Sequence, residues 1–414
     1  MTKKEFNWIL YDWANSAYAV AIMTAILPVY FKDIVSKGLD ANVSTAYWGY
    51  ANTAATLVLA ILAPILGSIA DYKGAKKKFF AVFLSLGVIS TALLSLTGQG
   101  DTIKCLTIYI FSSIGFFGAN VFYDSFLVDV TSKERMDLVS TYGFATGYIG
   151  SAIPLLISIL IIARPAWIGL NSAVSAMQVS FVITALWWLV FSLPFLFKVK
   201  QAYYVETTKN PIIDGFRRIF TTFKEIKKFK NVFIFLIAYF FYIDGVFTVI
   251  KMAAVFGKDI GISSKDLLII LMVTQIVAFP FAILFGKLAK RFSAETMILA
   301  GIGVYAFITI YACFIHTVFQ YWILAILTAT SQGGIQALSR SYFGKIIPKE
   351  NSAQFYGFYD IFGKFSSVIG PLLVALFSQL SGSSKYGIFS LVILFIIGGG
   401  ILLRIKTKPF NEGV

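Results

Sequence analysis

Nine polar side chains that could carry chemistry lie inside long apolar stretches of this sequence. Acids, amides and cations are costly in lipid, so such residues mark binding or proton-transfer sites, or structural pairs. They fall into four groups in which neighbours are three, four or seven residues apart, the spacing of one helix face. The groups are Asp12 and Asn15; Asn120 and Asp124; Asp244 and Lys251; and Gln332, Gln336 and Arg340.

Each ionisable member of these groups has two interpretations. Asp244 lies deepest in its stretch, and it either exchanges a proton or forms a structural ion pair with Lys251 or Arg340. Asp12, Asp124 and Arg340 lie nearer the ends of their stretches. They either contact a substrate or coupling proton, or form structural pairs at the membrane boundary.

The elements that position these groups are twelve apolar stretches of membrane length. A hydrocarbon core of about 30 Å needs about 20 apolar residues per helix, and 58% of the 414 residues are hydrophobic. The sequence therefore predicts an all-α integral membrane protein and excludes a soluble core of this size. The expected spans are 8–31, 45–70, 79–98, 104–128, 139–163, 173–197, 231–256, 265–290, 296–315, 319–343, 354–380 and 385–404.

Basic residues crowd into every second gap between these spans. Of the 35 Lys and Arg, 25 fall on the side of the two termini and 7 on the opposite side. Cytoplasmic loops carry this excess, so both termini are predicted to be cytoplasmic, in a bacterial inner membrane. Topology and contact with anionic lipid explain the net charge of +15, which gives no support for nucleic-acid binding.

The chain divides into two halves joined by one long polar connection. We expect a six-helix bundle over 1–197, a cytoplasmic linker over 198–230, and a second six-helix bundle with a short cytoplasmic tail over 231–414. The linker ends in NPIIDGFRRIFTTFKEIKKFK, whose apolar residues recur every three or four positions between basic ones. This pattern predicts an amphipathic helix in the headgroup layer, with a regulatory protein-binding role as the alternative.

The two halves repeat each other weakly. Gly67-Ser-Ile-Ala-Asp71 matches Gly286-Lys-Leu-Ala-Lys290, and the tripeptide Tyr-Gly-Phe occurs at 142–144 and again at 356–358. Two similar six-span units are the layout of alternating-access transporters, whose binding site lies where the repeats meet. The four polar groups occupy equivalent spans, the first, fourth, seventh and tenth, so the sequence predicts one shared cavity.

Motifs for enzymatic chemistry are absent from the sequence. It contains no phosphate-binding Gly-Lys-Ser/Thr loop, and one His with two Cys provides neither a metal cluster nor a catalytic triad. We expect no enzyme activity, no catalytic residue, no metal and no cofactor. Transport energy would come from an ion gradient, unless the protein is a passive uniporter.

The turn after the second span resembles a signature of the major facilitator superfamily. That signature is a Gly, an Asp four residues later, a basic residue, and then a Gly followed by a basic cluster. Gly67, Asp71 and Gly74 fit it, whereas Tyr72 replaces the basic residue and the cluster begins one residue late, at Lys76. In the superfamily this Asp belongs to a cytoplasmic latch between helices. The resemblance therefore implies a gating role for Gly67, Asp71 and Gly74.

Three further stretches resemble the branch that contains the vacuolar amino-acid effluxers of autophagy and their bacterial relatives. They are YDWANSAYA at 11–19, GGIQALSRSYFGKIIPKE at 333–350 and FYGFYDIFGKFSSVIGP at 355–371. The resemblance implies a twelve-helix facilitator. It also implies a cavity formed by Asp12, Asn15, Gln336, Ser339 and Arg340. Asp124 stands where relatives often have Asn, which adds a charge opposite Arg340.

These observations predict a secondary active transporter of a small polar solute, such as an amino acid or related metabolite. Its expected partners are that solute, a coupling proton or other ion, and anionic lipid, and it is expected to be a monomer. Two alternatives stay open. One is a multidrug exporter with a pocket built from the 41 Phe and 21 Tyr, and the other is a receptor or scaffold that does not transport.

Overall fold

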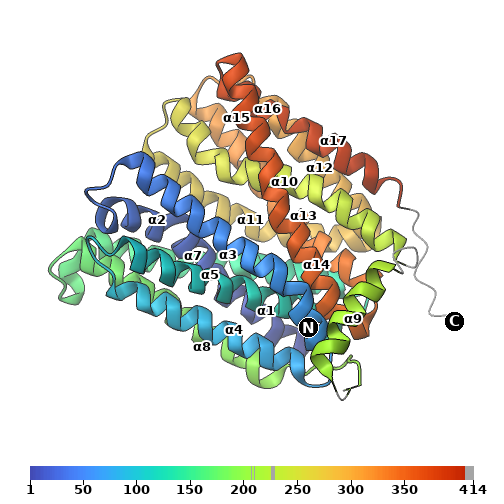
Figure 1. Cartoon of the computed structure of the whole chain (residues 1–414). Helices are drawn as coiled ribbons and strands as arrows, with labels where there is room; N and C mark the ends of the chain where they lie inside the picture. Colours follow the sequence, from blue (N-terminus) through green and yellow to red (C-terminus); the bar gives the residue numbers. More distant parts are fainter. Residues whose placement is uncertain (207, 209, 225–228, 406–414) are drawn as a thin grey trace. The chain divides into compact units, whose positions relative to one another are not determined.

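The computed structural model describes residues 1–206, 208, 210–224 and 229–405. The predicted tail after 405 and the end of the basic linker, 225–228, lie outside the described residues. Over the described ranges the chain is helical, apart from connecting turns and a β-bridge between Tyr72 and Val205 (Figure 1). The predicted all-α class is confirmed.

The helix bounds agree with the predicted spans to within several residues. In chain order the helices are α1 (Lys3–Tyr18), α2 (Ile26–Tyr30), α3 (Ala41–Ala70), α4 (Ala75–Leu93), α5 (Thr102–Ser125), α6 (Leu127–Val130), α7 (Met136–Ala163), α8 (Ala173–Lys198), α9 (Pro211–Lys224), α10 (Lys230–Asp259), α11 (Ser264–Phe292), α12 (Ala294–Ala312), α13 (Val318–Ile346), α14 (Ser352–Phe365), α15 (Ile369–Ser381), α16 (Ser384–Ser390) and α17 (Val392–Leu402).

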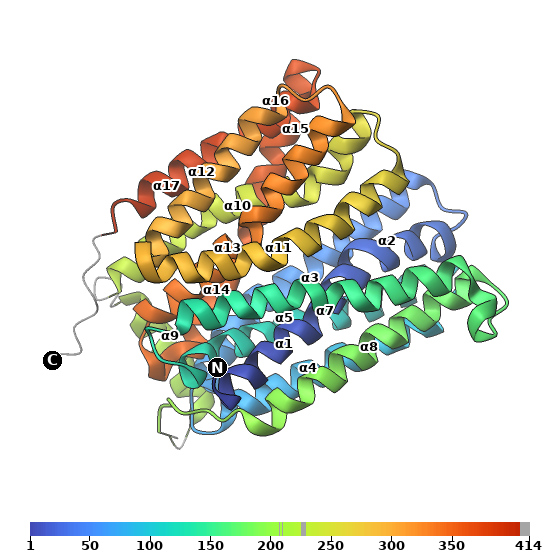
Figure 2. The ribbon, with the colours of Figure 1, turned by 180° about the vertical axis from the view of Figure 1, so that it is seen from behind.

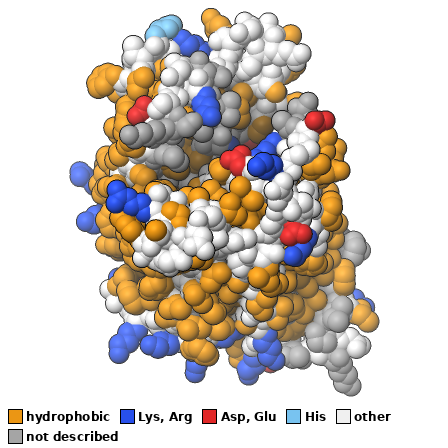
Figure 3. All heavy atoms as spheres, turned by 90° about the vertical axis from the view of Figure 1, so that its left-hand side faces the viewer, with side chains coloured by type: hydrophobic (Ala, Val, Ile, Leu, Met, Phe, Trp, Pro, Cys, Tyr) orange, Lys and Arg blue, Asp and Glu red, His pale blue; other side chains and the backbone are white. Residues whose placement is uncertain are grey.

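Eleven helical stretches in the described residues are long and apolar enough to cross a membrane. α13 provides the twelfth span. Its 29 residues exceed membrane length, but Gln332, Gln336 and Arg340 reduce its mean hydropathy. Large apolar side chains such as Ile61 and Leu372 are exposed, and apolar side chains cover much of the face drawn in Figure 3. Such exposure fits lipid contact.

The described chain forms two compact units that almost follow the two halves of the sequence. Unit 1 holds Met1–Val130, Thr146–Ile219 and Glu350–Gly357, and unit 2 holds Thr131–Ala145, Phe220–Lys349 and Phe358–Val414. Each unit therefore contains one short segment from the other half, which we call the 350–357 segment and the 131–145 segment. The first part of the predicted linker, through Ile219, belongs to unit 1.

Close helix packing and buried rings build unit 1. Gly87 and Gly115 lie in contact, which brings α4 against α5, and α1 packs against α8 (Figures 1 and 2). Trp8 and Tyr123 stack with their ring centroids 4.5 Å apart, and Tyr11 lies 4.5 Å from the same Tyr123 ring. All three rings are fully or almost fully buried, so they serve as core.

The first and eleventh spans depart from regular α-helix geometry. The first contains π-helical stretches at Ala19–Ala25 and Phe31–Val35, which flank Pro28. Proline has no N–H to donate to the preceding turn, and such departures from α geometry often occur at functional sites. In the eleventh span, a turn of 3-10 helix at Ser366–Val368 separates α14 from α15.

Candidate functional site

The polar groups of the first and fourth spans meet inside unit 1. The Asn15 side-chain amide on α1 donates from Nδ2 to Oδ1 of Asn120 on α5, at 2.8 Å. Asn15 is 6% exposed, and the hydroxyl of Ser16 lies 3.5 Å from its Oδ1. The structure thus brings together two of the amides that the spacing singled out.

The two carboxylates of these spans lie one helical turn from the amide pair. Asp12 on α1 is 8% exposed, and Asp124 on α5 is partly exposed. Gly147 of α7 lies against the Ser16 hydroxyl and the Asp12 carbonyl, so a side chain at this position would collide with α1. α7 therefore closes over the same stretch of α1 that carries Asp12 and Asn15.

In unit 2, Asp244 lies at the break in the eleventh span. Its Oδ2 accepts from the backbone N–H of Gly370 at 2.7 Å, and its Oδ1 accepts from the Thr248 hydroxyl at 3.2 Å. The side chain is fully buried. Gly370 is the second residue of α15, so the carboxylate satisfies an N–H that the start of this helix leaves without an intrahelical partner. Lys251, two turns further along α10, is exposed.

The polar ladder of the tenth span lies along α13. Gln332 is buried, Gln336 is partly buried, and the Gln336 Nε2 donates to the Gln332 carbonyl at 2.9 Å. Ser339, one position before Arg340, hydrogen-bonds the hydroxyl of Tyr242 on α10 at 2.7 Å. The bond between the two amides runs along α13 itself, and the Ser339 contact fixes the adjacent face of α13 against α10.

Arg340 is held by the 131–145 segment. Its Nε donates to the Ser140 hydroxyl at 2.9 Å, its Nη2 donates to the Ser140 carbonyl at 3.1 Å, and the guanidinium lies 4.5 Å from the centre of the Phe144 ring. Only 3% of Arg340 is exposed. The expectation that Asp124 adds a charge opposite Arg340 stays a prediction.

Two of the three predicted gating residues, Gly67 and Asp71, contact the 350–357 segment in unit 1. Asp71 is fully buried, its Oδ1 accepts from the backbone N–H of Ala353 at 2.8 Å, and its Oδ2 accepts from that of Gln354 at 3.1 Å. Gly67 lies so close to Ala353 that a side chain at 67 would meet its carbonyl. Gly74 precedes α4 with a φ of 73°, a backbone conformation that favours glycine.

The electrostatics of Asp71 reflect opposing effects. Burial raises the pKa of Asp71 to about 7, whereas Lys76, Arg218 and the two backbone donors lower it and offset part of the rise. The Arg218 guanidinium of α9 lies 3.5 Å from the Asp71 carboxylate.

The sequence reasoning missed a second buried cluster beside Asp71. Lys76, the first lysine of the basic cluster, forms a fully buried ion pair with Asp129 at 2.8 Å and donates to the Ser352 hydroxyl at 2.8 Å. The other oxygen of Asp129 accepts from the backbone N–H groups of Ala202 and Tyr203, at 2.7 and 2.9 Å. The signature predicted the basic cluster, but nothing in the spacing linked it to Asp129.

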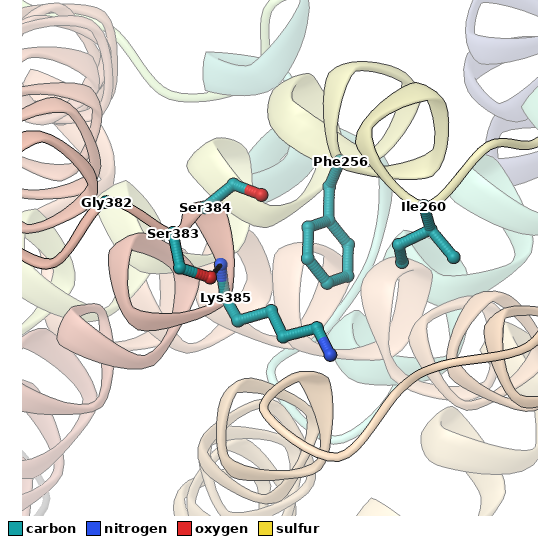
Figure 4. Close-up of a pocket in the computed structure, with 6 residues that line it drawn as sticks. All are labelled: Phe256, Ile260, Gly382, Ser383, Ser384 and Lys385. Atoms are coloured by element: carbon teal, nitrogen blue, oxygen red, sulfur yellow. Dashed lines mark hydrogen bonds between the residues drawn. The ribbon is translucent and has the colours of Figure 1, made fainter.

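A separate hollow of about 340 Å³ in unit 2 involves none of the predicted site residues. It lies between the end of α10 and the turn from α15 to α16, and Figure 4 shows the side chains of Phe256, Ser384 and Lys385 around it. The Lys385 ammonium lies 3.1 Å from Nδ1 of His316.

This chain resembles known proteins in sequence and in fold. The family model described as "Vacuole effluxer Atg22 like" matches residues 37–409, which is most of the chain. The chain belongs to the vacuole effluxer Atg22-like family. The resemblance to this branch is thereby confirmed.

Relatives of this Atg22-like protein include transporters by name. It is 52% identical over 413 residues to "Uncharacterized MFS-type transporter YxiO" of Bacillus subtilis (strain 168), and the match covers 99% of this chain and 96% of the relative. It is 24% identical over 487 residues to autophagy-related protein 22 of Saccharomyces cerevisiae (strain ATCC 204508 / S288c), a match that covers 97% and 91% of the two chains.

The fold of the Atg22-like chain is that of the major facilitator superfamily. The structure of the proton:xylose symporter XylE bound to 6-bromo-6-deoxy-D-glucose superimposes with a TM-score of 0.72 at 11% identity, covering 98% of this chain and 95% of that one. Family and fold together make this Atg22-like protein an integral membrane transporter of the facilitator type, and not an enzyme.

Proposed function

We propose that this Atg22-like protein carries a small polar solute, such as an amino acid or a related metabolite, by alternating access. The observation that carries the proposal is the Asn15–Asn120 amide pair, in which Asn15 is buried and Asn120 is partly exposed, with Asp12 and Asp124 one turn away. The pair uses one donor of Asn15 and one acceptor of Asn120. An amide has two N–H donors and two lone pairs, so both residues keep hydrogen-bonding capacity for a polar solute.

Coupling to protons is the second part of the proposal. Asp12, Asp124 and Asp244 are the candidate carriers, because a carboxylate in a membrane bundle is either paired or able to accept a proton. Asp244 has two donors fixed on its oxygens, which supports a structural role for it. Asp12 and Asp124 lie beside the amide pair and are the stronger candidates for coupling.

Solute flux in proteoliposomes tests both parts. The purified protein would be reconstituted, loaded with amino acids, and assayed for accumulation driven by a pH gradient and for counterflow without one. We expect Asp12→Asn or Asp124→Asn to abolish gradient-driven accumulation while counterflow persists. Asp33→Asn, at an exposed carboxylate, is the matched control. Full gradient-driven accumulation in an Asp12→Asn plus Asp124→Asn variant would contradict the coupling proposal.

A thermal-shift screen separates this proposal from the two alternatives. Trp8 and Tyr11 both pack against Tyr123 in the core of unit 1, and all three rings are buried, so these rings offer no open surface to a drug. Stabilisation by amino acids or similar polar solutes supports the proposal, because a ligand that binds only the folded protein raises its thermal midpoint. Stabilisation by amphiphilic cations alone favours a multidrug exporter. If no solute raises the thermal midpoint and no flux is detected, a receptor or scaffold is favoured.

Orientation, gating and lipid contact complete the proposal. The protein would act as a monomer in a bacterial plasma membrane with both termini in the cytoplasm, as the 25-to-7 division of basic residues favours. Anionic lipid would then contact the basic face. Gly67, Asp71 and Gly74 would act as the cytoplasmic gate through the 350–357 segment. Fusing a reporter that is active only in the cytoplasm to either terminus tests the orientation.

A further inference from the structure

The gating turn lacks a cation that its signature would provide. In the facilitator signature a basic residue directly follows the Asp, but this chain has Tyr72 there. Asp71 is nevertheless fully buried, and a buried carboxylate is costly without a cation or several donors beside it. Two cations lower the pKa of Asp71. One is Lys76, and the other is Arg218, which lies on α9 and is distant from Asp71 in the sequence.

Arg218 lies beside Tyr72, the residue that stands in place of the basic side chain of the signature. Its guanidinium lies 5.5 Å from the centre of the Tyr72 ring. Nη1 donates to the Ser68 carbonyl at 2.9 Å, while Nη2 donates to the Asn351 Oδ1 at 2.8 Å and reaches the Asp71 carboxylate at 3.5 Å. The Arg218 guanidinium therefore links the end of α3, the turn at Asp71 and the 350–357 segment. A planar guanidinium with several N–H donors in fixed directions suits such a contact.

α9 is built to approach this point. Gly215, one turn before Arg218, is buried, and a Cβ there would lie 2.9 Å from Ile69 and 3.0 Å from the Ser68 hydroxyl. Ile213 and Phe216 on the same helix are exposed. The face of α9 that carries Gly215 and Arg218 thus packs on the end of α3, and the face that carries Ile213 and Phe216 does not.

We propose that Arg218 of the linker helix provides a second cation of the cytoplasmic gate beside Lys76, at the turn where Tyr72 stands in place of a basic residue, so that α9 is a working part of the gate. The contacts that define it all lie within unit 1. Its consequence for flux rests on the transport function proposed above, but its effect on the 350–357 segment does not. Release of α9 would remove a donor from Asp71 and from Asn351 together.

Reactivity of a cysteine in the 350–357 segment tests the proposal without any substrate. Gln354→Cys, in a background with Cys105→Ser and Cys313→Ser, places a fully buried reporter beside Asp71, whose bond from the Gln354 backbone N–H is retained. In detergent we expect Arg218→Ala to speed maleimide labelling roughly five- to thirty-fold, because one charge-assisted hydrogen-bond network is lost. Arg218→Lys should give a smaller increase. Arg217→Ala, next to it and exposed, is the matched control.

Two further comparisons make the test specific. If Arg218 acts partly through Asp71, then Arg218→Ala plus Asp71→Asn should speed labelling by less than the product of the two single effects, since the two residues share one interaction while the contact of Arg218 with Asn351 is separate. Tyr72→Arg in the Arg218→Ala background should slow labelling again. The proposal would be overturned if Arg218→Ala were labelled no faster than Arg217→Ala. It would also be overturned if the effects of the two substitutions on the labelling rate simply multiplied in the double variant. Failed transport with these labelling effects intact would count only against the transport function.

Discussion

Replacing Asp244 on α10 tests whether this carboxylate caps the broken helix or carries protons. Asp244→Leu removes the acceptor for the Gly370 N–H and for the Thr248 hydroxyl. The hydroxyl can rotate toward a carbonyl of its own helix, but the backbone N–H of Gly370 cannot move. A buried donor left without an acceptor costs about 1–3 kcal/mol, and we take this range as the loss of stability for Asp244→Leu.

Asp244→Asn should behave differently. It keeps an oxygen for the Gly370 N–H, and its new amide N–H can donate to the Thr248 oxygen, so we expect a loss below about 1 kcal/mol. Each kcal/mol shifts the thermal midpoint by about 2–4 °C in domains of about 150–250 residues. The Leu variant should therefore melt roughly 2–12 °C below the parent, and the Asn variant within about 4 °C of it.

Two assays read the two roles separately. The thermal midpoint in detergent, followed by loss of the monodisperse chromatographic peak, reports the cap. Gradient-driven accumulation in proteoliposomes reports proton coupling. A cap alone predicts a weakened Leu variant and an Asn variant that still accumulates solute against its gradient. If the thermal midpoint of Asp244→Leu equals that of the parent protein, the proposed capping role of Asp244 is refuted. If Asp244→Asn is stable but keeps only counterflow, Asp244 carries the proton.

Three further predictions follow from the buried contacts. Gly67→Val should lower stability by about 1–3 kcal/mol, since its side chain must displace the 350–357 segment, and thermal midpoints would show this. Because the pKa of Asp71 rises from 3.8 to about 7 on folding, its contribution to stability is complete below pH 3.8 and is lost as the pH rises through 7. A pH series of melting curves should show this decline, and Asp71→Asn should flatten it. Asn15→Ala and Asn120→Ala should each reduce flux about tenfold by removing a hydrogen bond to the solute, and the double variant should be worse than either single variant, because each amide keeps hydrogen-bonding capacity of its own.

Helices and spans were predictable because lipid imposes a length and a composition on every crossing segment. The polar ladder of α13 shows where this signal weakens: Gln332, Gln336 and Arg340 make the span a candidate for function, and the same three residues lower its hydropathy. The π-helical stretches around Pro28 were not predicted, because a proline fixes one missing hydrogen bond but not how the neighbouring turns respond.

Side-chain partners were harder to predict than positions. The four-residue spacing placed Asn120 and Asp124 on one face, but the bond from Asn15 depends on how α1 packs against α5. For Asp244 the sequence offered charged partners, Lys251 or Arg340, and the partner seen is a backbone N–H that only a helix break exposes. Arg218 was assigned to the polar face of an amphipathic helix, because no periodicity shows that Tyr72 leaves Asp71 in need of a cation.

The weak repeat between the halves gains a physical meaning from the two exchanged segments. In unit 1, Gly67 lies against Ala353 of the 350–357 segment, and in unit 2 its counterpart Gly286 lies against Thr141 of the 131–145 segment. Both glycines are needed because a Cβ at either position would occupy the segment's place. The repeat therefore preserves the surface that receives a segment of the other half.

The acidic residue that binds each segment has opposite positions in the two units. In unit 1 the buried acid is Asp71, on the receiving turn, and the donors belong to the segment. In unit 2 the equivalent of Asp71 is Lys290, which is exposed, and the acid is Asp137 of the segment itself, which accepts from Ser341 at 2.7 Å and pairs with Lys345. Arg218 of the linker contacts Asp71, whereas the partners of Asp137 are Ser341 and Lys345 of α13. Under the gate proposal, release of α9 would therefore loosen the 350–357 segment and leave the contacts of Asp137 unchanged, so the two cytoplasmic segments would be held separately.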